Sequence, residues 1–168
     1  AAILILILSI PLTTARADDG YRLWLRYDKI TDRPYLKQCT RSFRSIMLTG
    51  DSQVLSAAAE ELAKGLGGMT GKSIEMVSAP GRRGTVVAGT FGSSPLIDAL
   101  LPDVSPGTTG EEGYLIRSVR HRGRRLTVIA SDGERGVLYG AFHLLRMAAT
   151  RSPLSNISLS GKPATRLR

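Results

Sequence analysis

The sequence SDGERGVLYGAFHLLRMAAT, residues 131–150, predicts the longest well-marked helix of the chain, and the rest is arranged around it. Ser131 or Asp132 is the expected N-cap, and Pro153 ends the element. Gly136 and Gly140 stand one turn apart; glycine inside a helix costs roughly 1 kcal/mol against alanine, so they predict close contact with a packed neighbour. Apolar residues recur at helical spacing and predict one buried stripe: Val137, Ala141, Leu144, Leu145 and Ala148, with Leu138 and Phe142 in a second row.

The residues before this helix alternate between strand and helix patterns. Strands are expected at 42–49, 73–77, 85–89, 112–119 and 124–130, the last two forming an antiparallel hairpin. One helix should begin at Asp51 or Ser52 and stop in the glycines of 65–68, interpreted as C-caps and a turn; a short one should follow Ser94. This order predicts an α/β fold, a two-layer sandwich with a mixed sheet and helices mainly on one face.

Residues 1–17 predict a signal peptide that is incomplete at its start. An apolar run over residues 1–8 is too short to span a bilayer, and Ala15 and Ala17 occupy the small-residue positions of a signal-peptidase site. Cleavage would leave Asp18 first and remove Arg16, which lowers the formal net charge from +9 to +8. We therefore expect an exported, periplasmic or extracellular protein with no membrane attachment after cleavage.

The arginines are compatible with a binding function. A strongly basic exported domain could bind acidic polysaccharide without being a catalyst. The basic loops would supply Arg82, Arg83, Arg120, Arg122, Arg124 and Arg125. Nucleic acid is not the expected partner, because no aromatic residues interleave these charges to stack on bases. Trp24, in a segment at 21–27 that alternates like an edge strand or an extended arm, is interpreted as an anchor for packing and not as a sugar platform.

The chain offers no catalytic constellation. Glycoside hydrolysis usually needs two carboxyl groups across one sugar, but the acids are scattered over caps, loops and helix surfaces. Glu111 and Glu112 are adjacent, and on an extended chain they would point to opposite faces. His121 and His143 lack partners at metal-ligand spacing, and Cys39 is the only cysteine. We expect no catalytic residue, no metal and no cofactor in this chain, and a structural role for His143.

Several stretches together resemble one enzyme family. The run from Gly136 to Arg146 is similar to the closing helix of the N-terminal domain of family 67 α-glucuronidases, which debranch xylan. The sequences DGYRLWLRY at 19–27, EGYLI at 112–116, GDS at 50–52 and the segment 155–160 agree in the same order, so the resemblance covers residues 18–168.

This resemblance implies two domains with different roles. Residues 18–168 would be the N-terminal accessory domain, and the catalytic carboxylates and the uronic-acid pocket would lie in a (β/α)8 barrel that is absent from this chain. The parent hydrolase would release α-1,2-linked (4-O-methyl)glucuronic acid from xylo-oligosaccharides, with this chain alone inactive and the barrel as its partner. A nonfunctional remnant is the third hypothesis, and it predicts an exposed apolar patch.

Overall fold

The computed structural model describes residues 26–92 and 94–164. The predicted signal peptide at 1–17 and Trp24 lie outside these residues. Of the strand or arm predicted at 21–27, only Arg26 and Tyr27 are described, and neither belongs to a strand. Among the described helices, none combines the length and the apolar composition that crossing a bilayer would need.

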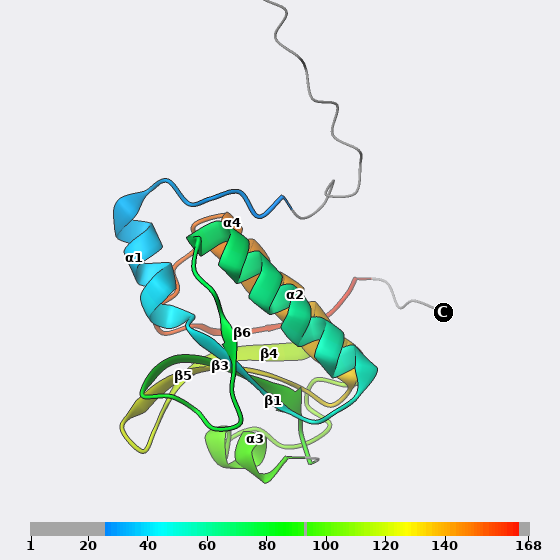
Figure 1. The fold of residues 1–168 in the computed structure, drawn as a ribbon. Helices are drawn as coiled ribbons and strands as arrows, with labels where there is room; N and C mark the ends of the chain where they lie inside the picture. Colours follow the sequence, from blue (N-terminus) through cyan, green and yellow to red (C-terminus); the bar gives the residue numbers. More distant parts are fainter. Residues whose placement is uncertain (1–25, 93, 165–168) are drawn as a thin grey trace, which may run out of the picture.

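The centre of the molecule is a mixed, open, six-stranded sheet in the order β2-β1-β3-β5-β4-β6 (Figure 1). Four neighbouring strands are parallel, and β4 is antiparallel to both β5 and β6. The strands are β1 (Ser45–Thr49), β2 (Glu75–Met76), β3 (Arg83–Thr90), β4 (Tyr114–His121), β5 (Arg124–Ser131) and β6 (Ser158–Gly161). The hairpin predicted around residues 120–124 is therefore confirmed, as is the mixed sheet.

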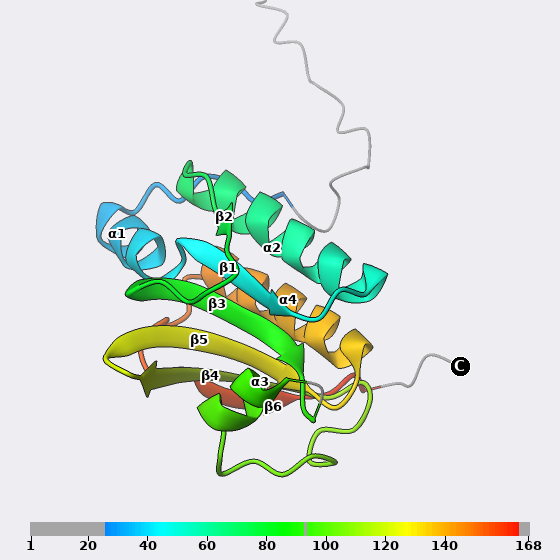
Figure 2. The same ribbon diagram turned by 60° about the horizontal axis from the view of Figure 1, so that its bottom comes forward.

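Helices cover the two faces of the sheet unequally, as Figure 2 shows. Helices α1 (Arg33–Ser42), α2 (Gln53–Thr70) and α4 (Glu134–Ala149) pack with the larger apolar cluster on one face. The short α3 (Pro95–Leu100), capped by the hydroxyl of Ser94 as predicted, covers the smaller cluster on the other face. An α/β sandwich with its helices mainly on one face is thus what the chain forms.

Helix α4 buries the predicted stripe. All five stripe residues are at most 1 % exposed, and Leu138 and Phe142 pack against them at its margin. A Cβ atom at Gly140 would lie 2.5 Å from the Ile129 side chain, and one at Gly136 would collide with Ser131 and with the Gly113 carbonyl. The predicted close approach at both glycines is confirmed.

The predicted N-cap of α4 is wrong. Gly133 occupies the cap position, with no side-chain cap hydrogen bond. Ser131 ends β5, where its hydroxyl bonds to the Gly113 carbonyl and accepts from the Gly133 amide. The Asp132 carboxylate accepts hydrogen bonds from a distant loop instead. Both side chains are committed to tertiary contacts, so neither caps the helix.

The predicted end of α2 is also wrong, and so is the ranking of the helices by length. Helix α2 continues through the glycines at 65, 67 and 68 and ends at Gly71, whose φ of 66° makes it the left-handed C-cap. A Cβ atom at Gly65 would lie 2.5 Å from Leu145 and 2.7 Å from the Tyr27 ring. Gly65 therefore allows close helix packing and does not end the helix. Helix α2, at 18 residues, is longer than α4, at 16.

Two elements were not predicted. Helix α1 is capped by Asp32, whose carboxylate accepts from the Tyr35 amide, and it extends to Ser42, so β1 starts three residues later than expected. Only Tyr35 and Cys39 of α1 are buried, which leaves a weak apolar signal in the sequence. Strand β6 alternates between exposed and half-buried residues at the sheet edge.

Candidate functional site

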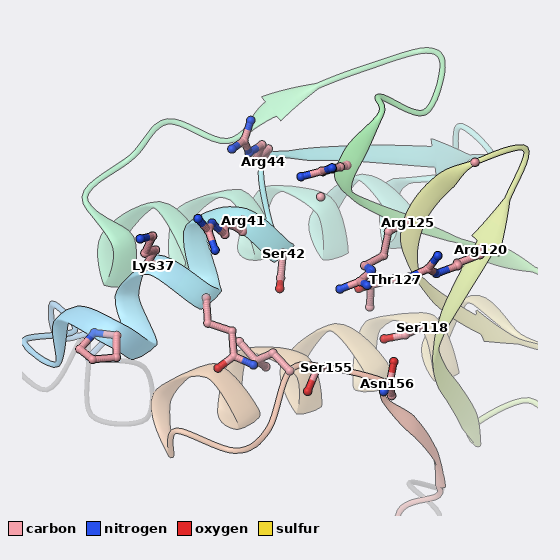
Figure 3. A pocket seen from close by; sticks show the side chains of 16 residues that line it. Lys37, Arg41, Ser42, Arg44, Ser118, Arg120, Arg125, Thr127, Ser155 and Asn156 are labelled. Atoms are coloured by element: carbon pink, nitrogen blue, oxygen red, sulfur yellow. The ribbon is translucent and has the colours of Figure 1, made fainter.

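An open groove of about 770 Å³ lies on the helix-bearing face of the sheet (Figure 3). It lies where β1, β3 and β5 begin, beside α1 and the segment that follows α4. Its lining contains six basic side chains and no carboxylate: Lys37, Arg41, Arg44, Arg83, Arg120 and Arg125. Such a lining favours an anionic ligand.

Three of these arginines form a row across neighbouring strands. In the β3–β5 register Arg83 lies opposite Arg125, and in the β4–β5 register Arg125 lies opposite Arg120. Residues directly opposite one another in a sheet project from the same face with their Cβ atoms about 4.5–5.5 Å apart. Three arginine side chains therefore start from neighbouring positions on adjacent strands.

A glycine joins this row to helix α1. Gly84 lies at a register shift between β3 and β5, and its φ of 76° is left-handed. A Cβ atom there would lie 2.7 Å from the Arg41 carbonyl oxygen, and the Gly84 carbonyl accepts the Arg44 amide at 2.6 Å. Because the two backbones touch here, the end of α1 reaches the start of β3, and Arg41 and Arg44 join the strand arginines.

The floor and the far wall of the groove are polar. Ser118 and Thr127 lie opposite each other in the β4–β5 register, one rung along from the arginine row on the same face, and both line the groove. The wall after α4 contains Ser155 and Asn156, whose φ of 58° is left-handed. This wall is attached to β4 by two hydrogen bonds between Ser118 and Ile157, of 2.7 and 3.0 Å.

The charges of the groove are exposed and uncompensated. All six basic side chains are solvent-exposed, and within the described chain none of them forms an ion pair. The ion pairs join Arg117 to Asp103 and Arg135 to Glu112 instead.

The structure brings together some of the six arginines proposed for polysaccharide binding. Arg83, Arg120 and Arg125 line the groove, and Arg82 lines an adjoining cavity of about 410 Å³ with Arg44. Arg124 donates to the Pro80 carbonyl, and Arg122 occupies the hairpin turn with a φ of 48°; neither is in the groove.

Three of the six basic residues of the groove were not predicted to bind a ligand: Lys37, Arg41 and Arg44. The helical spacing of Lys37 and Arg41 was the available signal, but helix α1 was not predicted, and Arg44 lies between α1 and β1.

The acids do not form a catalytic pair in this groove, because it contains no acid. Asp132 binds backbone amides, Glu112 pairs with Arg135, and Glu61 accepts from the Tyr27 hydroxyl. Partial burial raises the pKa of Asp132, but hydrogen bonds from residues 107, 109 and 110 outweigh it and lower the pKa overall. Such a carboxylate is stabilised in its charged form and is poorly suited to donating a proton.

Two further reactive side chains, His143 and Cys39, lie outside the groove. His143 Nδ1 lies 2.6 Å from the Tyr114 hydroxyl, with the rings edge to face, and burial and the nearby Arg146 charge lower the pKa of His143. Burial raises the pKa of the Cys39 thiol to about 11, which keeps it protonated and unreactive at neutral pH. In the described part of the chain no three His, Cys, Asp or Glu side chains are grouped so that they could hold a metal ion.

The chain forms an α/β domain with a basic groove, and sequence comparison places it in a family. The family model described as "Glycosyl hydrolase family 67 N-terminus" matches residues 23–144, so the chain belongs to this family. No curated protein matches the chain.

Solved structures share the fold. A family GH115 4-O-methyl-α-glucuronidase with specificity for decorated arabinogalactans is 20 % identical with a TM-score of 0.52, over 63 % of this chain and 13 % of its own. A GH138 enzyme targeting pectin rhamnogalacturonan II is 17 % identical with a TM-score of 0.51, over 73 % of this chain and 12 % of its own. The chain thus corresponds to about one-eighth of each of these enzymes.

Proposed function

We propose that this chain is the non-catalytic N-terminal domain of an exported α-glucuronidase, in which it supports a separate catalytic barrel. The observation that carries the proposal is the family match over residues 23–144, since the family is defined by the N-terminus of glycosyl hydrolases. The apolar residues 1–8, followed by the small residues of a signal-peptidase site, support export.

The proposed substrate is a xylo-oligosaccharide that carries α-1,2-linked (4-O-methyl)glucuronic acid, released during xylan breakdown. One of the structural neighbours is itself a 4-O-methyl-α-glucuronidase, which supports a uronic acid as the sugar removed. In the barrel, one carboxyl group would protonate the leaving oxygen and another would activate water, with inversion of configuration. The carboxylate-free lining of the groove supports a non-catalytic role for this domain.

A defective remnant is a weaker explanation. It would leave a large apolar patch where a partner is missing. Among the large apolar side chains that the structure describes, only Met76 is exposed, at 53 %.

The proposal is tested by hydrolysis of aldotetraouronic acid. The purified chain is assayed alone, a separately expressed family 67 barrel is assayed alone, and the two are then mixed. We expect no release of glucuronic acid by the chain alone, and a more active or more heat-resistant barrel in the mixture. Release by the chain alone would place the chemistry in this domain and overturn the proposal.

A further inference from the structure

We propose that the basic groove is a binding site for a uronic-acid-bearing polysaccharide, with sugar carboxylates on the row Arg83, Arg125 and Arg120 and sugar hydroxyls on the polar floor. The choice of a uronate among anions rests on the proposed function. The site itself rests on the geometry of the groove.

The arginine row is unfavourable without a ligand. Like charges directly opposite each other in a sheet destabilise it. Here two such pairs share Arg125, and no carboxylate lines the groove to compensate them. An anion would remove this repulsion, because a planar guanidinium binds a carboxylate through two parallel hydrogen bonds.

The rest of the groove selects among anions. Its volume of about 770 Å³ lies within the range of roughly 300–1,000 Å³ that is usual for ligand sites. The hydroxyls of Ser118 and Thr127 and the amide of Asn156 suit the many hydroxyl groups of a sugar chain. No aromatic ring lines the groove, so it lacks the stacking platform on which single-stranded nucleic acids depend.

The groove and the end of strand β6 lie at opposite ends of the sheet. The groove lies at the amino ends of β1, β3 and β5. Strand β6 runs the other way along β4 and ends at Gly161, opposite Tyr114 at the far end of the sheet (Figure 2). The two ends are separated by the eight residues of β5, which span about 26 Å.

The test compares glucuronoxylan with the same polymer after its carboxyl groups have been reduced to alcohols. Binding to the whole chain is measured by affinity electrophoresis and calorimetry, at low salt and at about 0.15 M salt. We expect the acidic polymer to bind and the reduced one not to. The variant Arg83→Gln/Arg125→Gln should weaken binding roughly tenfold or more.

Two further variants distinguish binding at the groove from attraction by the net charge of the protein. Arg135→Gln/Lys162→Gln removes the same charge from exposed residues outside the groove and should bind like the unchanged chain. Arg83→Lys/Arg125→Lys keeps the charge but loses the paired hydrogen bonds, and it should be intermediate.

Several outcomes would overturn the proposal. Equal loss in both glutamine variants would mean that only net charge matters, and equal binding of the reduced polymer would mean that carboxylates do not. Tighter binding of a DNA duplex or of inorganic phosphate would show a phosphate site instead. The barrel assay is independent of these results: its failure with intact groove binding would overturn only the catalytic assignment, and the reverse result would overturn only the groove.

Discussion

Asp132 fastens a loop from a distant part of the chain. Its carboxylate accepts hydrogen bonds from the amides of Gly107, Thr109 and Gly110 and from the Thr109 hydroxyl, at 2.6 to 2.8 Å. The Thr109 hydroxyl oxygen in turn accepts from the Asp132 amide. These bonds secure the connection between α3 and β4 against the end of β5.

We expect Asp132→Asn to lower the free energy of unfolding by about 1–2 kcal/mol at neutral pH, since an amide cannot satisfy all these donors and lacks the charge. The pKa of the folded carboxyl lies below its unfolded value of about 3.9, so its stabilisation is complete above that pH. It is lost as the pH falls through the folded-state pKa. Urea titrations of both proteins at several pH values measure the difference.

Asp28→Asn serves as the control, because Asp28 is exposed and has no hydrogen bond described. It should leave the unfolding curve unchanged. A difference between Asp132→Asn and the unchanged chain that persists undiminished at pH 2 would show that the charge of the carboxylate is not what holds the loop.

Burial along α4 and the caps at Ser52 and Ser94 were predicted correctly, but the cap of α4 was not. The stripe of α4 follows from helical periodicity, which a sequence displays directly. Ser131 and Asp132 had the right chemistry for a cap, but they bond to Gly113 and to the loop at 107–110. A polar side chain can bond to any group that the fold brings near it, and a local sequence pattern does not show which distant segments those are.

At the scale of elements, Gly84 links strand β3 to helix α1. A methyl group there would meet the Arg41 carbonyl, which is backbone and cannot move aside cheaply. We expect Gly84→Ala to destabilise the fold by about 1–2 kcal/mol from its left-handed φ and by about 1–3 kcal/mol more from the contact. Thermal unfolding measures the loss.

Gly123→Ala is the matched control, because Gly123 also has a left-handed φ, of 74°, but has no atoms within 4 Å of the added methyl. It should show the conformational cost alone. If the two variants unfold at the same temperature, the contact between Gly84 and α1 contributes nothing to stability.

Strands and helices with strong patterns were predicted in the correct order, while their ends were less certain. The glycines at 65, 67 and 68 suggested a helix end because glycine is a poor helix former. The helix continues because Tyr27 and Leu145 cover Gly65. Helix α1 was not predicted because only two of its residues are buried, which leaves little apolar periodicity in the sequence.

At the scale of the whole molecule, the sequence predicted the fold class but only three of the six basic residues of the groove. The six basic residues come from α1, from the segment between α1 and β1, from the start of β3 and from the β4–β5 hairpin. They meet because of the strand order and the β3–β5 register, which depend on long-range pairing. The arginine clusters were visible in the sequence, but their arrangement as a row was not.

The segment that precedes α1 covers the glycine-rich end of helix α2. Tyr27 lies over Gly65 and Gly68 and bonds through its hydroxyl to Glu61, and the Ile30 amide donates to the Met69 carbonyl at 2.9 Å. Without this cover, the glycine-rich end of α2 has low intrinsic helicity. We expect Tyr27→Ala to speed amide hydrogen exchange roughly tenfold at residues 67–71 and to leave the amides of α4 protected.

Tyr27→Phe separates the two contributions, because it keeps the ring and loses only the bond to Glu61. Exchange close to that of the unchanged chain would assign the protection to the ring, and unchanged exchange in Tyr27→Ala would show that the helix end holds itself closed. The rate at which the glycine-rich end of α2 opens would then depend on Tyr27, which is far from it in sequence. The least protected part of a buried helix would then be governed from outside the helix.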